Sequence, residues 1–266
     1  MTKVAILDLY NGSANLGMAN IQKIITENGF SFEVFDVRSK GEVPNTDFDI
    51  YISTGGPGSP FEGEGKQWEA NYFSFVEKLW HHNQTQKNKK HVFFICHSFQ
   101  MMVRHFNLGQ VCKRKSMSFG IFPVHLTDEA KEDGLFQELP HPFYAADFRY
   151  YQVVLPNEDK LKELGGHIIA LEKVRPNVEM DRAVMAMQIS PEFIGTQFHP
   201  EADPTGMKTY YEHPEKRLEV EKTYGEYKYE SIMECLEDKD SDSILNTYQH
   251  ILPNFLKQAR EKLIEA

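Results

Sequence analysis

Short apolar runs and longer amphipathic segments alternate through the first hundred residues. Four runs have the pattern expected of strands in a sheet, at residues 3–9, 30–37, 48–54 and 91–96. Three segments have the apolar spacing of helices or directly follow a strand, at residues 16–28, 66–82 and 98–106. Strands separated by helices in this way predict a parallel sheet with helices on both faces.

The pattern changes after about residue 110, where strand-like runs follow one another closely. They cover residues 119–126, 143–154, 167–173, 182–189 and 193–198. Strands without long helices between them predict an antiparallel or mixed extension of the same sheet. The predicted fold class is therefore α/β, a doubly wound and mostly parallel sheet with an antiparallel extension.

Residues 202–266 differ again, because they are acidic and helical in pattern. They contain 14 Asp and Glu against 9 Lys and Arg, a net charge of −5. An apolar stripe predicts a last helix over residues 243–264. We therefore predict one domain over residues 1–201 and an acidic helical extension over residues 202–266 that packs on the same domain.

The composition is that of a globular protein. Of the 266 residues, 41% are hydrophobic, 12% aromatic and 26% charged, which excludes a largely disordered chain, a collagen-like repeat and a disulfide scaffold. Lys and Arg number 29 and Asp and Glu number 39, so the net charge is −10. Since nucleic acids are bound through cationic groups, we expect no nucleic-acid partner.

Cysteine usage and the terminal pattern favour a cytoplasmic protein. Cys96, Cys112 and Cys235 form no CxxC pair and have no zinc-like spacing. Residues 1–10 have the pattern of a strand rather than of a secretory signal. No run approaches the ~18 apolar residues that span a bilayer. We expect no metal, no cofactor and no membrane partner.

The first candidate for chemistry is Cys96, which ends the apolar run FFIC. Ligands of doubly wound sheets bind at the carboxyl ends of strands. On a strand-to-helix turn at that edge, a nucleophile is exposed, the next backbone N–H can stabilise an oxyanion, and the helix N-terminus favours a thiolate. Taken alone, Cys96 also fits a structural cysteine at a strand end.

The second candidate is the pair His199 and Glu201 in the segment FIGTQFHPE. Pro200 disfavours a helical conformation for the residue before it, so the segment should be extended, with positions i and i+2 on one face. The carboxylate could then orient the imidazole, and the imidazole could deprotonate a thiol. A loop histidine with an unrelated glutamate is the alternative.

The third candidate is the loop TGGPGSP at residues 54–60. Successive glycines let backbone N–H groups approach a substrate closely, although a tight turn after a strand also explains them. No GK[ST] follows, so this is not a phosphate loop. Residues 12–17 (GSANLG) likewise lack the dinucleotide-binding pattern.

In this order and spacing, the three motifs resemble those of the class I, triad-type glutamine amidotransferases. TGGPGSP is similar to their oxyanion-strand loop, ICHSFQ to their nucleophile turn, and QFHPE to their His–Glu pair. The resemblance covers roughly residues 3–201 and is strongest to free-standing domains like the glutaminase half of GMP synthase. It implies a flavodoxin-like sheet.

The resemblance also implies a role for each matched position. Cys96 would attack the side-chain amide of glutamine, His199 would act as base and then as acid, and Glu201 would orient His199. The backbone N–H groups of Gly56 and His97 would form the oxyanion hole. The residues expected to contact substrate are Gly55, Gln100, Arg149, Tyr150 and Tyr151.

Two positions depart from the family pattern. The family has G-x-C-x-G around the nucleophile, whereas this chain has Phe94 and Ser98 in place of the glycines. A strained turn favours small neighbours, so Phe94 must find room that glycine would not need. Where many relatives carry His-x-Asp, this chain has Arg149-Tyr150-Tyr151, so its contacts to the substrate's α-amino and carboxylate groups should differ. Arg149 could bind an additional carboxylate.

Three functions are compatible with these motifs. The leading hypothesis is hydrolysis of a γ-glutamyl amide through a cysteine thioester, with the ammonia released or passed to a separate synthase subunit. The second is a thiol hydrolase of γ-glutamyl peptides or conjugates, which the loss of His-x-Asp favours. The third is a catalytically silent binding or regulatory protein on the same fold, which the bulk of Phe94 favours.

The middle of the extension, residues 208–242, is polar and rich in tyrosine. Its tyrosines are Tyr210, Tyr211, Tyr224, Tyr227 and Tyr229. Tyrosine supplies interface area at low entropic cost. Because the stretch follows Glu201 closely, we expect a surface excursion near the rim of the site, where it would shield a thioester or contact a partner such as a second copy of the chain. An ordinary helical decoration is the alternative.

Overall fold

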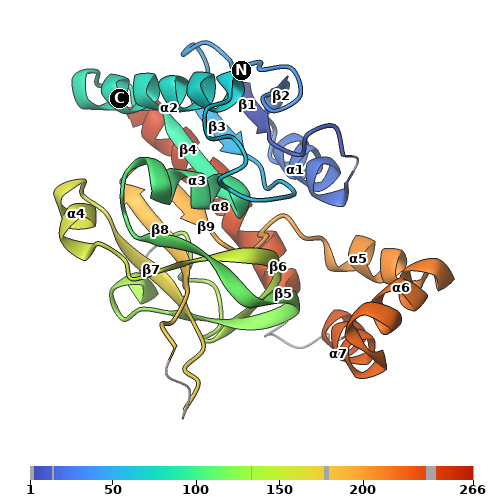
Figure 1. Cartoon of the computed structure of the whole chain (residues 1–266). Helices are drawn as coiled ribbons and strands as arrows, with labels where there is room; N and C mark the ends of the chain where they lie inside the picture. Colours follow the sequence, from blue (N-terminus) through green and yellow to red (C-terminus); the bar gives the residue numbers. More distant parts are fainter. Residues whose placement is uncertain (1–2, 14, 133, 177–179, 238–243, 266) are drawn as a thin grey trace.

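Nine strands form one sheet in the part of the chain that the computed structural model describes, residues 3–13, 15–132, 134–176, 180–237 and 244–265. In chain order they are β1 (Lys3–Asp8), β2 (Ser31–Asp36), β3 (Ile50–Ser53), β4 (His91–Ile95), β5 (Gln110–Leu126), β6 (Phe143–Val154), β7 (His167–Glu172), β8 (Val184–Ser190) and β9 (Phe193–Thr196). Their order across the sheet is β2-β1-β3-β4-β9-β8-β7-β5-β6 (Figure 1).

The helices between and after the strands follow the predicted alternation. They are α1 (Leu16–Glu27), α2 (Gln67–Thr85), α3 (His97–His105), α4 (Glu158–Glu163), α5 (Pro204–Glu212), α6 (Pro214–Tyr224), α7 (Glu226–Glu237) and α8 (Ile244–Glu265), with a 3-10 turn at Glu129–Glu132. Within the described ranges, none of these helices combines the length and the apolarity needed to cross a bilayer.

The sheet has a parallel half and an antiparallel half. Strands β2, β1, β3, β4 and β9 pair in parallel, which is the 2-1-3-4-5 order of flavodoxin-like folds with β9 as the fifth strand. Strands β8, β7, β5 and β6 continue the sheet with antiparallel pairing. The predicted flavodoxin-like α/β class with an antiparallel extension is confirmed.

One predicted strand was too short. The run at residues 119–126 is the second part of β5, which begins at Gln110. The first part was missed because residues 113–116 are charged or polar and none of them is buried, and its register against β6 shifts between Lys113 and Ser118. Nothing in a polar, irregular stretch marks it as a strand in the sequence.

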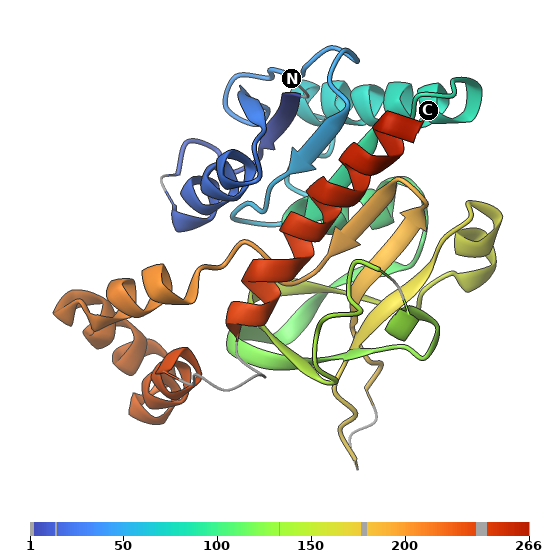
Figure 2. The ribbon, with the colours of Figure 1, turned by 180° about the vertical axis from the view of Figure 1, so that it is seen from behind.

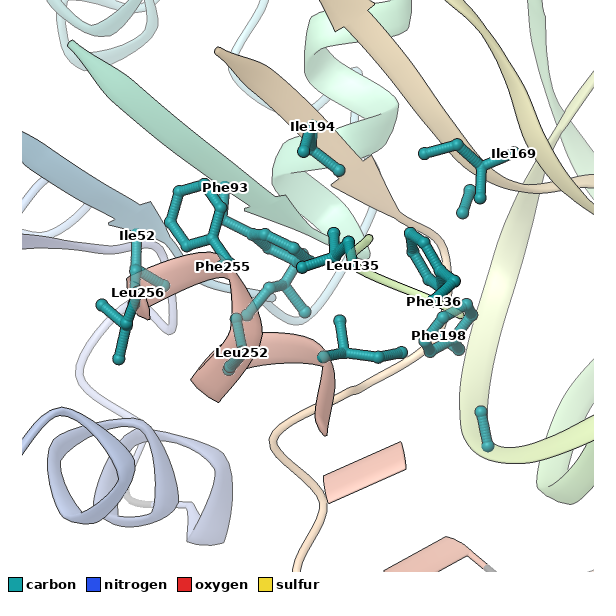
Figure 3. Packing of buried hydrophobic residues seen from close by; sticks show 14 of the residues in the cluster. Ile52, Phe93, Leu135, Phe136, Ile169, Ile194, Phe198, Leu252, Phe255 and Leu256 are labelled. Atoms are coloured by element: carbon teal, nitrogen blue, oxygen red, sulfur yellow. The ribbon is translucent and has the colours of Figure 1, made fainter. Parts of the chain in front are cut away.

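Helices α1 and α8 cover one face of the sheet. Figure 2 shows α8 crossing this face beside the strands. The side chains of Leu252, Phe255 and Leu256 from α8 are buried against Ile52 of β3 and Phe93 of β4 (Figure 3). The rings of Phe93 and Phe255 meet edge to face at 5.2 Å between centroids. The end of the C-terminal extension therefore contributes to the central core.

Helices α2 and α3 cover the opposite face. Tyr72 and Phe75 of α2 and Phe99 and Met102 of α3 are buried there in a second cluster. With a helix pair on each face, the central parallel strands are enclosed on both sides, which explains why they are almost wholly apolar.

Helices α5, α6 and α7 form a group beside the sheet, as both ribbon views show (Figure 1, Figure 2). Met207, Tyr211 and Ile232 of this group belong to a third buried cluster that includes Ile121 of β5 and Ala146 of β6. Residues 238–243, which include the end of the predicted excursion and the start of the predicted last helix, lie outside the described residues.

Candidate active site

Cys96 lies at the turn between β4 and α3, at the carboxyl edge of the parallel strands. Its backbone has a φ of 48° and a ψ of −94°, a combination that residues other than glycine rarely adopt. Such strain persists only where the surrounding structure holds it. The Ser98 hydroxyl accepts a hydrogen bond from the N–H of Ile95 and donates to the carbonyl of Ser53, both at 2.8 Å, and so ties this turn to β3.

The expected crowding by Phe94 does not occur. Its ring is fully buried among the residues that face α2 and α3, and it meets the ring of Phe193 edge to face at 5.7 Å. Cys96 is instead grouped with the cluster on the other face of the sheet. The Phe94 side chain therefore fills core volume away from the thiol. Its bulk no longer favours a catalytically silent protein.

His199 and Glu201 form a hydrogen-bonded pair, as their spacing predicted. Nδ1 of His199 lies 2.8 Å from Oε1 of Glu201, and the Glu201 carboxylate is almost completely buried. The backbone N–H of His199 donates to the carbonyl of Ala146 at 2.9 Å, which anchors this segment to β6. The Tyr10 hydroxyl donates to the same Glu201 oxygen at 3.4 Å.

The surroundings of His199 favour its protonated form. Burial by itself lowers the pKa of the imidazole, but the negative charge of Glu201 and the neighbouring Cys96 side chain, with hydrogen bonds to both groups, raise it well above its ordinary value. Burial, with the negative charge of Glu201, raises the pKa of Tyr10, so its hydroxyl stays protonated and donates. The arrangement suits a thiolate–imidazolium pair beside a carboxylate.

His97 is not placed to act as the base. Its ring is buried, and burial, together with Arg38 and Arg104, lowers its pKa to about 3, so the ring is neutral at physiological pH. His97 is the first residue of α3. The first backbone N–H groups of a helix have no partner within the helix, so this N–H is suited to an oxyanion.

The glycine loop after β3 brings backbone close to the catalytic candidates. A Cβ at Gly56 would lie 2.5 Å from the carbonyl oxygen of Leu9, and a Cβ at Gly55 would lie 2.9 Å from Cε1 of His199. Arg38 fixes the loop by donating to the carbonyl oxygens of Leu9 and Pro57, at 3.2 and 2.7 Å. Glycine is therefore required here for close packing, and Gly55 abuts the imidazole.

Two cavities meet at Cys96. The first, which we call the Arg149 cavity, has a volume of about 260 Å³. It is lined by Gly56, Pro57, Gly58, Cys96, His97, Gln100, Met117, Phe148, Arg149, Tyr150 and Tyr151. Every residue expected to contact substrate lies on it except Gly55.

The second cavity, which we call the Tyr210 cavity, has a volume of about 410 Å³ and lies on the His199 side of Cys96. It is lined by Tyr10, Ser13, Asn15, Leu16, Gly17, Asn20, Gly56, Pro57, Cys96, Phe148, His199, Glu201, Ala202, Met207, Tyr210 and Tyr211. The extension thus reaches the rim of the site through α5.

Two of the expected substrate residues are already engaged inside the protein. Nε of Arg149 donates to both oxygens of Asp147 at 2.8 and 3.0 Å, and its Nη2 lies 3.6 Å from Glu172. The Gln100 amide donates to the carbonyl of Tyr151 and to the side chain of Gln197, both at 3.2 Å. The additional carboxylate that Arg149 was expected to bind is thus that of Asp147, within the protein itself.

Sequence reasoning missed several residues around Cys96 and Glu201. The side-chain amide nitrogen of Gln197 donates a hydrogen bond to the Cys96 sulfur at 3.7 Å. Phe148 lines both cavities. A Cβ at Gly17 would lie 2.4 Å from the Tyr10 hydroxyl and 3.1 Å from Oε1 of Glu201. Gln197 is the first residue of the QFHPE motif, so the motif could have identified it as a site residue. Nothing in the sequence linked Tyr10 or Gly17 to Glu201.

Metal ligation has no candidate in the described part of the chain, where no group of three or more His, Cys, Asp and Glu side chains is placed to hold an ion. The groups that the site offers for chemistry are a cysteine thiol, an imidazole, a buried carboxylate and backbone N–H groups.

The sequence matches the family model for class I glutamine amidotransferases over residues 13–215. The match covers more than half of the chain, and the protein belongs to this family. No curated protein matches the sequence.

Solved structures share the fold at low sequence identity. A glutamine amidotransferase from Thermotoga maritima is 18% identical, with a TM-score of 0.70 over 98% of both chains. A putative GMP synthase subunit from Thermoplasma acidophilum is 18% identical, with a TM-score of 0.56 over 76% of this chain and 86% of its own. The glutaminase domain of Trypanosoma brucei CTPS, solved with acivicin, is 16% identical, with a TM-score of 0.52 over the same shares.

Proposed function

We propose that the protein cleaves the γ-amide bond of glutamine or of a related γ-glutamyl amide through a thioester on Cys96. The observation that carries the proposal is the convergence of a strained cysteine, which lines both cavities, with the hydrogen-bonded His199–Glu201 pair, which lines the Tyr210 cavity. Membership of the class I glutamine amidotransferase family supports the same chemistry.

In the acylation step, the Cys96 thiolate attacks the γ-carbonyl carbon of the substrate. The backbone N–H groups of Gly56 and His97 stabilise the oxyanion that forms. The carbon–nitrogen bond then breaks, and the His199 imidazolium gives its proton to the departing nitrogen. In the second step His199 removes a proton from water, which attacks the thioester and releases glutamate. Glu201 holds the imidazole and stabilises its charged form.

The charges near the Arg149 cavity suit an amino-acid substrate. Arg149 belongs to an internal cluster in which the three guanidinium groups of Arg114, Arg149 and Arg175 surround the two carboxylates of Asp147 and Glu172. The cluster has one net positive charge, and Arg149 is the member of it that lines the cavity. This charge favours the α-carboxylate of a glutamyl group there, with the γ-amide directed toward Cys96.

The two candidate functions differ in what happens to the nitrogen that leaves. Passing ammonia to a separate synthase is one use, and the likeness to a putative GMP synthase subunit supports it. Release of an amine from a γ-glutamyl peptide or conjugate is the other, and the size of the Tyr210 cavity favours it.

Covalent labelling tests the assignment of Cys96. A glutamine-like diazoketone should add one label per chain, and acivicin, bound in the Trypanosoma brucei domain, is a second probe. Labelling should fall to background in Cys96→Ser, and Cys112→Ser and Cys235→Ser are the matched controls that should still label. Labelling that survives Cys96→Ser would overturn the assignment.

A further inference from the structure

The Tyr210 cavity is larger than the cleavage of glutamine requires. The group that leaves from glutamine is ammonia, which needs about the 30 Å³ that a water molecule occupies in the liquid. The cavity has about 410 Å³ and opens directly beside Cys96. If the substrate were glutamine, the leaving ammonia would fill only a small part of this volume.

The position of His199 shows which cavity faces the leaving group. His199 lines the Tyr210 cavity, whereas His97, whose N–H is proposed to stabilise the oxyanion, lines the Arg149 cavity. In the proposed chemistry the departing nitrogen takes its proton from His199. The nitrogen and anything attached to it must therefore point toward the Tyr210 cavity.

The walls of this cavity are mainly apolar and aromatic. Leu16 comes from α1, Met207, Tyr210 and Tyr211 from α5, and Phe148 from β6. Apart from the His199–Glu201 pair, no Asp, Glu, Lys or Arg stands among the described residues that line it. The side-chain amide of Asn15 on its rim is already hydrogen-bonded on both sides. Its oxygen accepts from the backbone N–H of Met18, and its nitrogen donates to the carbonyl of Ser13.

We propose that the Tyr210 cavity holds the nitrogen substituent of an N-substituted γ-glutamyl amide, and that this substituent is a neutral apolar chain or ring. The inference rests on the proposed thioester chemistry. The γ-glutamyl group lies in the Arg149 cavity, the carbon–nitrogen bond at Cys96 breaks as the carbon–sulfur bond forms, and His199 protonates the nitrogen. The product of this step is a neutral amine, which leaves through the Tyr210 cavity before water hydrolyses the thioester.

The test compares γ-glutamyl methylamide, butylamide and hexylamide with glutamine, with release of glutamate as the common readout. The three alkylamines have nearly equal basicity, so differences in kcat/KM among their amides report contacts of the chain rather than leaving-group chemistry. Full burial of a methylene is worth about fourfold. We expect kcat/KM to rise by at least about tenfold from methyl to butyl. A butylamide bearing a terminal carboxylate should be slower than its neutral counterpart, because the carboxylate would lose its hydration against walls that are mainly apolar.

A pair of tyrosine variants ties the effect to the cavity. Tyr210→Ala removes part of the wall and should lower the butyl-to-methyl ratio of kcat/KM severalfold. Tyr227→Ala is the matched control, because Tyr227 belongs to the same helical group, is 84% exposed and lines neither cavity. It should leave the ratio unchanged.

The possible failures are distinguishable. If glutamine is cleaved but kcat/KM is flat or falls from methyl to hexyl, the apolar substituent is excluded and the thioester chemistry stands. An equal decrease of the butyl-to-methyl ratio of kcat/KM in Tyr210→Ala and Tyr227→Ala also excludes the Tyr210 cavity as the site of the substituent. If none of the four amides releases glutamate and Cys96 takes no label, the proposed function fails and this inference fails with it.

Discussion

At the scale of single residues, the site depends on a few side chains that are held by close packing. Cys96 keeps a strained backbone because the Ser98 hydroxyl bonds the end of β4 to β3. The His199 imidazole is fixed by Glu201 on one side and by the bare backbone of Gly55 on the other. Each functional group is thus oriented before substrate arrives, which is the condition for efficient nucleophilic catalysis.

The roles of His199 and Glu201 predict unequal losses on substitution. His199→Ala removes the proton acceptor and donor, and should lower kcat/KM for a γ-glutamyl amide by several decades. Glu201→Gln keeps the shape and a hydrogen bond to His199 but removes the charge that raises its pKa, so the loss should be smaller. Steady-state rates of glutamate release measure both. A larger loss in Glu201→Gln than in His199→Ala would contradict these roles.

The residues that the sequence revealed and those that it hid differ in a physical way. Cys96, His199 and Gly56 stand in local motifs whose spacing limits the chemistry they can perform. Tyr10, which follows β1, and Gly17, in the first turn of α1, reach Glu201 only because the segment that follows β9 passes close to them in the folded chain. Contacts between segments far apart in sequence leave no trace in spacing or periodicity, so they could not be predicted.

At the scale of elements, apolar periodicity predicted the parallel half well and the exposed parts poorly. Strands such as β4 are buried on both faces and are therefore continuous apolar runs. The first part of β5 is polar and its register against β6 is irregular, so it was missed. For the helical extension, the acidic pattern indicated helices, and only the fold could place α5 on the wall of the Tyr210 cavity.

Replacing residues 208–242 by a short Gly/Ser linker tests the part that the helical group plays. The replacement removes Tyr210 and Tyr211 from the cavity wall but keeps α8, which packs on the sheet. We expect a folded protein, judged by circular dichroism, with altered turnover of γ-glutamyl amides or with the loss of an oligomeric contact in light scattering. A folded variant with equal turnover and equal particle mass would show that the group has neither role.

At the scale of the whole molecule, α8 joins the end of the chain to the central core. It buries Leu252 and Phe255 against the face of the parallel strands and lies near the start of β4. His91, the first residue of β4, is only 4% exposed, and burial, with the positive charge of Lys262 on α8, lowers its pKa to about 4. The core therefore contains a histidine that is neutral in the folded state.

This buried histidine predicts a loss of stability in mild acid. As pH falls through about 6.5, His91 gains a proton in the unfolded chain, whereas the folded protein takes it up only near 4. The stabilising contribution is therefore complete above pH 6.5 and is lost on going down to pH 4. Between pH 7.5 and 4.5 it should cost about 2–3 kcal/mol of unfolding free energy.

Urea unfolding at the two pH values measures this loss. His91→Gln should show a smaller decrease than the wild type, because the variant has no proton to take up at this position. His81→Gln, at an exposed histidine of α2, is the matched control. Equal pH dependence in His91→Gln and in the wild type would contradict the assignment of the effect to His91.

The central claim, a γ-glutamyl thioester on Cys96, is tested most directly by trapping the acylated protein. The protein is mixed with γ-glutamyl methylamide, quenched in acid within the first turnover, digested and analysed by mass spectrometry. The account predicts a glutamyl adduct on the peptide that contains Cys96, and none on those that contain Cys112 or Cys235. Hydrolysis of the amide with no adduct on Cys96, or with the adduct on another residue, would contradict it.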